Sequence, residues 1–283
     1  AAAAEAPARP PAPAAAPANR SALAGRLSQA WAVQAPPVVI EVYYSPGCQH
    51  CLDFISAAVV QLLEAKLPGN LVGITVLPLP FNILPPEQCK DSPGCYGDLA
   101  PLCAMKATQP HPAPADLPAM LPATRFLLCV LGQSVATPQL PPTIVKDCAI
   151  QAGLPWQPLE ACARGQEVVD IMFGPDYNNA APAAIDRLTA AGFNKENPYA
   201  MPLVFINGEL LLCAGGGCTA SKTPTGSTPL PQPGSLLFLA CQRLKPAPPA
   251  CQHLPPPAQP LQTGPTPACQ NCAEAGAFRW RPA

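Results

Sequence analysis

The first well-defined pattern along the chain is an apolar run followed by a helical repeat. Val38–Tyr44 is rich in β-branched and aromatic residues, which is typical of a buried strand. From residue 52 to residue 63 the apolar residues recur at helical spacing, and the helix is expected to end before Pro68. A second strand is expected at residues 71–77. A strand, a helix and a strand joined by short connections predict a parallel βαβ unit.

The middle of the chain, residues 89–191, consists of short apolar segments separated by prolines. Helices are expected at residues 98–107, 123–131, 143–152 and 176–192. Five cysteines fall among these segments, namely Cys95, Cys103, Cys129, Cys148 and Cys162. The pattern predicts a helical insertion that disulfide bonds hold together.

Strand patterns return in the last third of the chain. Residues 203–206 and 209–212 are apolar and flank an Asn-Gly pair at 207–208, which tolerates the positive φ angles of a tight turn, so a β-hairpin is expected. Residues 214–234 are rich in Gly, Thr and Pro and are expected to form a loop. Residues 235–244 are expected to form a short helix.

The two ends of the chain lack the composition of a packed domain. Many of the 43 prolines lie there in runs with alanine, and such runs have too few large apolar side chains to form a core. We expect residues 1–36 to be a disordered arm, residues 37–251 to form one domain, and residues 252–283 to be a tail without a fold of its own.

Charged residues are sparse. They make up only 12% of the chain and the formal net charge is -1, so no basic stripe is present to bind nucleic acid or an anionic membrane. No stretch reaches the ~18 consecutive apolar residues of a spanning helix, so no membrane span is expected. The chain begins at Ala1 without a signal pattern, and we therefore expect a mature product or a fragment.

Fourteen cysteines are many for 283 residues. This number indicates metal sites in a reducing cytosol or disulfides in an oxidising compartment. A metal framework is expected to show paired Cys-x-x-Cys knuckles with His close by, whereas most of these cysteines stand singly. The pattern favours disulfides and the secretory pathway. Asn19 begins an N-glycosylation triplet, a motif that often arises by chance.

One cysteine pair lies where a strand is expected to give way to a helix, in Cys48-Gln49-His50-Cys51. Cys48 would lie at the helix N-terminus, where unpaired N–H groups and the helix dipole stabilise a thiolate. Cys48 is therefore the expected nucleophile, and Cys51 the thiol that resolves the mixed disulfide. A protonated His50 would favour the thiolate further, and would do so most at mildly acid pH.

Two other interpretations of this pair stay open. Cys48 and Cys51 could form a structural disulfide at a helix start, or they could be half of a zinc site. By residue type alone, a second zinc set could consist of Cys251, His253, Cys269 and Cys272. We favour disulfides or a loose tail there, so neither a metal nor another cofactor is expected. The glycines between Cys213 and Cys218 suit a small local disulfide.

Pro202 stands directly before the strand expected at residues 203–206. In a thioredoxin-like fold, a cis-proline at this position faces the Cys-x-x-Cys and shapes the groove for a bound polypeptide. A trans proline at a strand start is the common alternative. Because a βαβ unit and a cysteine pair lie upstream, we favour the cis form.

An ordered set of motifs spans residues 37–251. It comprises residues 42–44, Cys48 and Cys51, Cys95 and Cys103, residues 126–129, 148–149, 159–163 and 199–208, and residues 236–242 with Cys251. In this order the motifs resemble the gamma-interferon-inducible lysosomal thiol reductase (GILT) family.

The resemblance implies an α/β fold, with a thioredoxin-like core and a disulfide-rich helical insertion, to which the composition adds Pro-rich disordered ends. It implies reduction of protein disulfides in an acidic, lysosome-like compartment; the cysteine count alone also allows a secreted protein. The partners would be disulfide-containing polypeptides and a small thiol reductant. The family's roles fall on Cys48 as nucleophile, Cys51 as resolving thiol and Pro202 as groove proline.

The sequence also departs from the family. The family's signature is Cys-Gln-His-Gly followed by a further Cys. The corresponding segment here is Cys89-Lys90-Asp91-Ser92-Pro93-Gly94-Cys95, which keeps the two cysteines but not the Gln-His-Gly. Residues 214–234 are an insertion and the tail after Gln252 is an extension. A His before the second active cysteine is frequent in disulfide oxidases and isomerases. Three functions are therefore considered: a thiol reductase, an oxidase or isomerase of the secretory pathway, and a non-catalytic secreted cysteine-rich binding protein.

Overall fold

The computed structural model describes residues 38–45, 47–78, 93–108, 117–137, 140–173, 186–187, 189–190, 201–223, 225–252 and 254. All of them belong to one compact unit, Ala35–Ala283. The predictions for the arm at residues 1–36, for the tail beyond residue 254 and for most of the helix at residues 176–192 lie outside the described residues.

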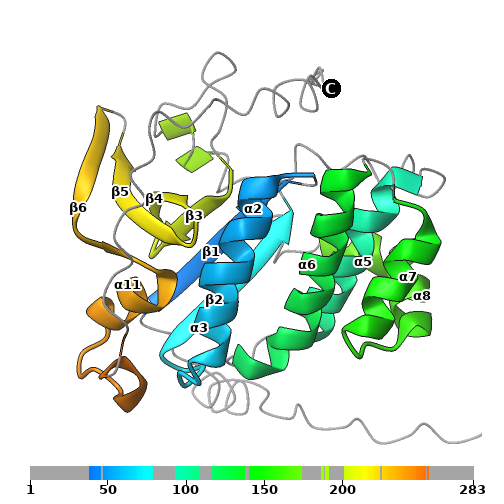
Figure 1. The fold of residues 1–283 in the computed structure, drawn as a ribbon, viewed down its shortest axis with the longest axis horizontal. Helices are drawn as coiled ribbons and strands as arrows, with labels where there is room; N and C mark the ends of the chain where they lie inside the picture. The colour runs from blue at the N-terminus through cyan, green and yellow to red at the C-terminus, as the bar shows by residue number, and fades with distance from the viewer. Residues whose placement is uncertain are drawn as a thin grey trace, which may run out of the picture. The chain divides into compact units, whose positions relative to one another are not determined.

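A six-stranded sheet with the order β2-β1-β3-β4-β5-β6 forms the centre of the described fold (Figure 1). Its strands are β1 (Val38–Tyr44), β2 (Val72–Pro78), β3 (Leu203–Ile206), β4 (Glu209–Ala214), β5 (Gly217–Thr223) and β6 (Gly226–Gly234). β1 and β2 are parallel, which confirms the predicted βαβ unit, and every other pair of neighbours is antiparallel.

One continuous helical segment connects β1 to β2. It consists of α2 (Gln49–Phe54), a π-helical turn η1 (Ile55–Val59) and α3 (Val60–Glu64), with right-handed helical backbone at both junctions. The predicted helix at residues 52–63 is confirmed. Its Phe54 and Leu62 are fully buried and belong to the same core as Ile40 of β1.

The side chains of β1 alternate between the two faces of the sheet. Val38, Ile40, Val42 and Tyr44 belong to the large core that the helices cover. Tyr43 instead belongs to a small second cluster with Leu203, Phe205 and Leu210. The helix-covered face is the one that carries the cysteine pair, because Cys48 and Cys51 belong to the large core.

The helical insertion is present beside this core, and its helices include α5 (Pro93–Thr108), α6 (Leu121–Ala136), α7 (Pro142–Gln151), α8 (Trp156–Arg164) and α9 (Gln166–Phe173). The first three confirm the helices expected at 98–107, 123–131 and 143–152, whereas α8 and α9 were not predicted. Disulfides join α5 to α8 through Cys103–Cys162, and α6 to α7 through Cys129–Cys148. The expected disulfide-tied helical insertion is therefore confirmed for the described residues.

The prediction of a loop at residues 214–234 is wrong, because β5 and β6 occupy most of this segment. The hairpin between β4 and β5 turns at Gly215 and Gly216, whose φ angles are 55° and 90°, and the predicted Cys213–Cys218 disulfide bridges its two strands. β5 lacks alternating apolar residues, and it is a strand because its backbone pairs with β4. The preceding Asn207-Gly208 turn is confirmed, with φ angles of 51° and 79°.

The expected C-terminal helix is confirmed as α11 (Leu236–Arg243), which Ser235 caps by accepting a hydrogen bond from the Phe238 N–H. Cys241 of α11 forms a disulfide with Cys251 of the short 3-10 helix η4 (Pro249–Cys251). The alternative in which Cys251 binds zinc is therefore wrong, because its sulfur is already bonded.

One described helical segment is long and apolar enough to cross a membrane, by length and composition only. It is Leu117–Ala136, with a mean hydropathy of 1.4, and it combines the 3-10 turn η3 (Leu117–Met120) with α6. A buried core helix passes the same test. Phe126 and Leu127 of this segment are fully buried in the large core, next to the disulfide-linked helices.

Candidate functional site

Cys48 occupies the N-cap of the helical segment that follows β1. Its backbone is extended, with φ -88° and ψ 104°, and the helix begins at the next residue. The Cys48 sulfur accepts a hydrogen bond from the backbone N–H of Cys51 at 3.2 Å, as the side-chain oxygen of Ser or Asp does at an ordinary N-cap. The strand-to-helix setting that the sequence predicted for this cysteine is confirmed.

Cys48 and Cys51 form a disulfide with their Cα atoms 5.3 Å apart. The two residues differ slightly in burial, since Cys48 is 3% exposed and Cys51 0% exposed. Both residues are therefore buried in the large core.

The C-terminal part of α6 supports the loop that leads to Cys48. Gly47 has a φ of 66°, and a Cβ atom on it would lie 3.5 Å from the backbone oxygen of Ser134. In the same region Gly132 faces the Leu52 side chain, with a Cβ-to-Cδ2 distance of 3.9 Å. The helical insertion therefore packs directly against the turn that positions the cysteine pair.

Pro202 lies at the same end of the sheet as Cys48. The Met201–Pro202 peptide bond is cis, as predicted, and Pro202 is buried. β3 pairs Leu203 with Tyr43 of β1, so the next step of the register places Pro202 beside Tyr44, the last residue of β1. Cys48 follows Tyr44 by four residues. The three predicted site residues Cys48, Cys51 and Pro202 therefore lie at the same end of the sheet.

His50 lies in the first turn of α2, between the two cysteines, and is partly exposed. Its neighbour Gln49 donates a hydrogen bond from Nε2 to Oδ1 of Asp53 at 2.7 Å on the exposed side of the helix. His50 thus lies in the helical turn between the two cysteines and is partly open to solvent.

The opposite face of the sheet carries a polar cluster that the sequence did not predict. Arg187 donates to Oε2 of Glu41 at 2.8 Å and lies over the Phe205 ring, 4.4 Å from its centroid. The Tyr43 hydroxyl donates to Oε1 of Glu41 at 3.2 Å. Burial raises the pKa of Tyr43 well above its usual range, Glu41 raises it further, and Arg187 opposes both effects.

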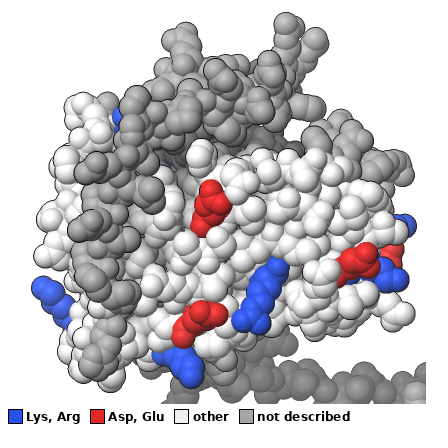
Figure 2. All heavy atoms as spheres, viewed as in Figure 1, with Lys and Arg blue, Asp and Glu red and all other residues white. Residues whose placement is uncertain are grey.

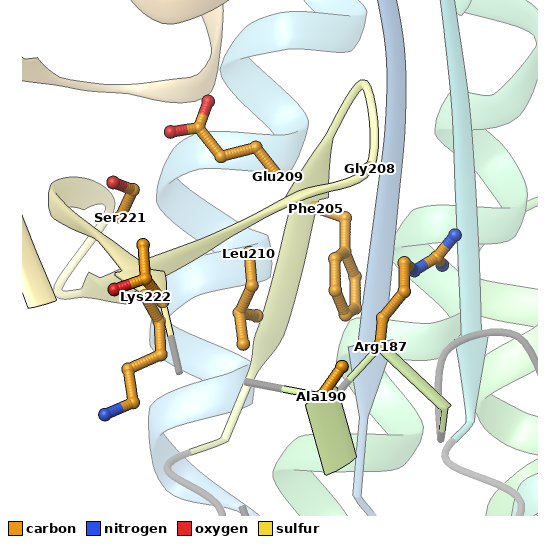
Figure 3. Close-up of a pocket in the computed structure, with 9 residues that line it drawn as sticks. Arg187, Ala190, Phe205, Gly208, Glu209, Leu210, Ser221 and Lys222 are labelled. Atoms are coloured by element: carbon orange, nitrogen blue, oxygen red, sulfur yellow. The ribbon is translucent and has the colours of Figure 1, made fainter. Parts of the chain in front are cut away.

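A shallow hollow lies beside this cluster (Figure 3). Its walls are formed by Arg187, Phe205 and Leu210, with Glu209 and Lys222 at its sides. None of the described residues that line it is a cysteine or a histidine. Arg187 and Glu41 are 146 positions apart, so no local sequence pattern could have indicated that they form an ion pair.

Few charged groups lie on the face that α2 and α6 present, and they form no patch of one sign, since in places acidic and basic residues stand next to one another (Figure 2). Within the described ranges, no group of three or more His, Cys, Asp or Glu side chains could hold a metal ion.

No protein-family model and no curated protein matches the sequence. Among solved structures, the chain is similar to the reduced form of the disulfide bond oxidoreductase DsbG from Mycobacterium tuberculosis, with 13% identity, a TM-score of 0.38 and coverage of 63% of this chain and 73% of that chain. It is also similar to α-DsbA1 of Wolbachia pipientis, with 16% identity, a TM-score of 0.38 and coverage of 62% and 71%. It is similar as well to MdbA, a thiol-disulfide oxidoreductase from Actinomyces oris, with 16% identity, a TM-score of 0.35 and coverage of 65% of this chain and 75% of that chain.

Likenesses of this strength indicate no activity. The fold is nevertheless clear from the chain itself, which has a thioredoxin-like core. A parallel β1–β2 pair is linked by a helix that begins at a Cys-x-x-Cys, and β3 follows a cis-proline and runs antiparallel to β1.

Proposed function

We propose that this protein is a thiol–disulfide oxidoreductase that reduces disulfides in polypeptides, with Cys48 as nucleophile and Cys51 as resolving thiol. The observation that carries the proposal is the position of Cys48 at a helix N-cap, where its sulfur accepts the Cys51 N–H and is paired with the Cys51 sulfur. A thiolate at this position has a hydrogen-bond donor and the positive end of the helix dipole beside it.

The reaction has two exchange steps. The Cys48 thiolate attacks one sulfur of the substrate disulfide, a Cys48–substrate disulfide forms, and the other substrate sulfur leaves as a thiolate. Cys51 loses its proton and attacks the Cys48 sulfur, which releases the second substrate thiolate and closes the Cys48–Cys51 disulfide. Two electrons and two protons thereby pass from the pair to the substrate, and a small thiol reductant restores the dithiol.

Pro202 and His50 have supporting roles in this proposal. Pro202 adjoins the end of β1 next to the cysteine loop, where its ring would shape the groove for an extended polypeptide. A charged His50 would keep part of Cys48 as thiolate at mildly acid pH, where an ordinary thiol is almost wholly protonated.

Membership of the GILT family and an acidic, lysosome-like or secreted location are part of the same proposal. The disulfides that join α5 to α8, α6 to α7 and α11 to η4 support an oxidising route of maturation. The order of the GILT-like motifs within residues 37–251 supports a lysosome-like location.

His50 favours a second candidate, a disulfide oxidase or isomerase that uses the same two cysteines. An imidazolium beside the pair stabilises the reduced form, and a stabilised reduced form makes the disulfide a stronger oxidant. The reduction potential of the Cys48–Cys51 pair, measured against glutathione, separates the candidates. A value near about -270 mV supports the reductase, and a value near about -120 mV supports the oxidase.

Insulin reduction tests the proposed activity at pH values from about 4.5 to 8. The wild-type protein is compared with Cys48→Ser and with the matched control Cys129→Ala/Cys148→Ala, which removes a disulfide between two helices of the insertion. We expect activity in the wild type and the control, and none in Cys48→Ser. Equal activity in Cys48→Ser, or an inert wild type whose Cys48 resists alkylation after mild reduction, supports the non-catalytic binding protein instead.

A further inference from the structure

A second disulfide, Cys213–Cys218, lies at the same end of the sheet as the active pair. β4 pairs Leu211 with Val204 of β3, and the two strands are antiparallel, so Cys213, two residues after Leu211, and Pro202, two residues before Val204, lie toward the same end of the sheet. Pro202 in turn adjoins Tyr44 of β1. Tyr44, Pro202 and Cys213 thus lie toward one end of three neighbouring strands, which are about 5 Å apart.

The hairpin disulfide also lies on the same face of the sheet as Cys48. Val204 and Leu211 belong to the helix-covered core, and Cys213, two residues after Leu211, packs against that core. Its partner Cys218 is fully buried within it.

The tip of the hairpin contacts the helix that carries the cysteine pair. A Cβ atom on Gly216 would lie 2.8 Å from the Cβ of Ala57 in η1, so only a glycine fits there without movement. α2 itself contacts β4. The β4–β5 turn is therefore packed against Ala57 of η1, nine residues beyond Cys48, while β4 itself reaches α2.

We propose that Cys213–Cys218 is a second redox-active disulfide, which receives two electrons from the reduced Cys48–Cys51 pair. This inference rests on the proposed function, because it needs a reactive Cys48 thiolate. None of the other described disulfides belongs to a strand that borders β3, so the proposal concerns this bond alone.

The difference in burial assigns the two sulfurs their roles. Cys213 is partly exposed, and Cys218 has no exposed surface. The Cys48 thiolate attacks the Cys213 sulfur, a Cys48–Cys213 disulfide forms, and Cys218 leaves as a thiolate that takes up a proton. Cys51 then loses its proton and attacks the Cys48 sulfur, and Cys213 leaves and is protonated. The products are a Cys48–Cys51 disulfide and a Cys213/Cys218 dithiol.

The test follows the reduction of Cys213–Cys218 by limiting dithiothreitol, with alkylation and peptide mass spectrometry at successive times. Wild type is compared with Cys48→Ser/Cys51→Ser, and with wild type alkylated at Cys48, which avoids any change in folding. Cys241–Cys251 serves as the reference disulfide in each sample. We expect reduction of Cys213–Cys218 to be at least about tenfold faster in the untreated wild type, with Cys241–Cys251 equal in all three.

Two results overturn the inference: equal rates in the three proteins, or a Cys213–Cys218 bond that stays oxidised while Cys48 and Cys51 are fully reduced. Insulin reduction by Cys213→Ala/Cys218→Ala separates the two proposals. If that variant and the wild type both reduce insulin while the three rates are equal, the inference alone fails. If the wild type does not reduce insulin, the proposed function fails.

Discussion

The sulfur of Cys48 accepts a hydrogen bond from the backbone N–H of Cys51 at 3.2 Å, so one helical turn holds the resolving residue against the nucleophile. The donor is a main-chain group, and it therefore remains in place when the Cys51 side chain is changed. The two functions of Cys51, as N–H donor and as resolving thiol, can be separated by substitution.

Cys51→Ser is expected to trap the mixed disulfide between Cys48 and its substrate. The Cys51 N–H still stabilises the Cys48 thiolate, whereas the second exchange step has lost its attacking sulfur. Incubation with insulin and analysis of intact mass without reductant should show a covalent adduct and turnover reduced by at least about a hundredfold. Cys48→Ser/Cys51→Ser is the control and should form no adduct. Turnover at the wild-type rate by Cys51→Ser contradicts the assigned roles.

His50→Gln is expected to make the reduction potential of the Cys48–Cys51 pair more negative. A charged imidazole stabilises the thiolate of the reduced form, and its removal should cost about 30 mV, which is about a tenfold change in the equilibrium constant. Redox titration against glutathione near about pH 5 measures the change, with Gln49→Ala as the neighbouring exposed control. An unchanged potential in His50→Gln, or an equal change in Gln49→Ala, contradicts this role of the His50 charge.

Cys129→Ala/Cys148→Ala is expected to lower the free energy of unfolding by about 2–4 kcal/mol. This disulfide joins α6 to α7 across a sequence separation of 19, so its loss releases chain entropy in the unfolded state. Urea unfolding under non-reducing conditions measures the change. Insulin reduction per folded molecule should stay within about twofold of wild type. A large loss of activity at unchanged stability contradicts a purely structural role.

Tyr43 is expected to make the free energy of unfolding fall at high pH. Its pKa is raised in the folded protein, mainly by burial, so the unfolded chain loses this proton first as the pH rises above about 10. The unfolded state then binds fewer protons, and stability that is present below about pH 10 is lost above it, by up to about 1.4 kcal/mol per pH unit.

Comparison with Tyr43→Phe isolates this effect. Urea unfolding near pH 9 and near pH 11 should show a larger fall in the free energy of unfolding for the wild type than for the variant. Effects of other titrating groups are common to both proteins and cancel. Parallel falls in the two proteins show that the Tyr43 proton is not responsible.

Local patterns were sufficient for the part of the fold that carries the cysteine pair. Five of the seven residues of Val38–Tyr44 are buried, and the apolar residues of 52–63 recur at helical spacing, so each element could be predicted from its own residues. Cys48 could be predicted at the helix N-cap because it lies between this strand and this helix. α8 was missed although its buried residues Leu159, Cys162 and Ala163 have helical spacing, because the helix has only nine residues and contains Pro158 in its first turn.

Other features depend on parts of the chain that are distant in sequence. β6 is mostly exposed and contains three prolines, and it is a strand because β5 pairs with it at the edge of the sheet. The pairing of Cys103 with Cys162 is set by the packing of α5 against α8. The contact of Gly216 with Ala57 brings the second disulfide next to the active helix, and no pattern within either segment indicates it.

The alkylation rate of Cys48 as a function of pH tests the central claim most directly. The protein is mildly reduced and treated with limiting iodoacetamide at pH values from about 4 to 9, and the labelled peptides are quantified. The helix N-cap and the Cys51 N–H predict that Cys48 is labelled before Cys51, with a midpoint at least about one pH unit below the ~8.5 of an ordinary thiol. Labelling of Cys48 that follows an ordinary thiol, or that is no faster than labelling of Cys51, contradicts the proposed redox pair.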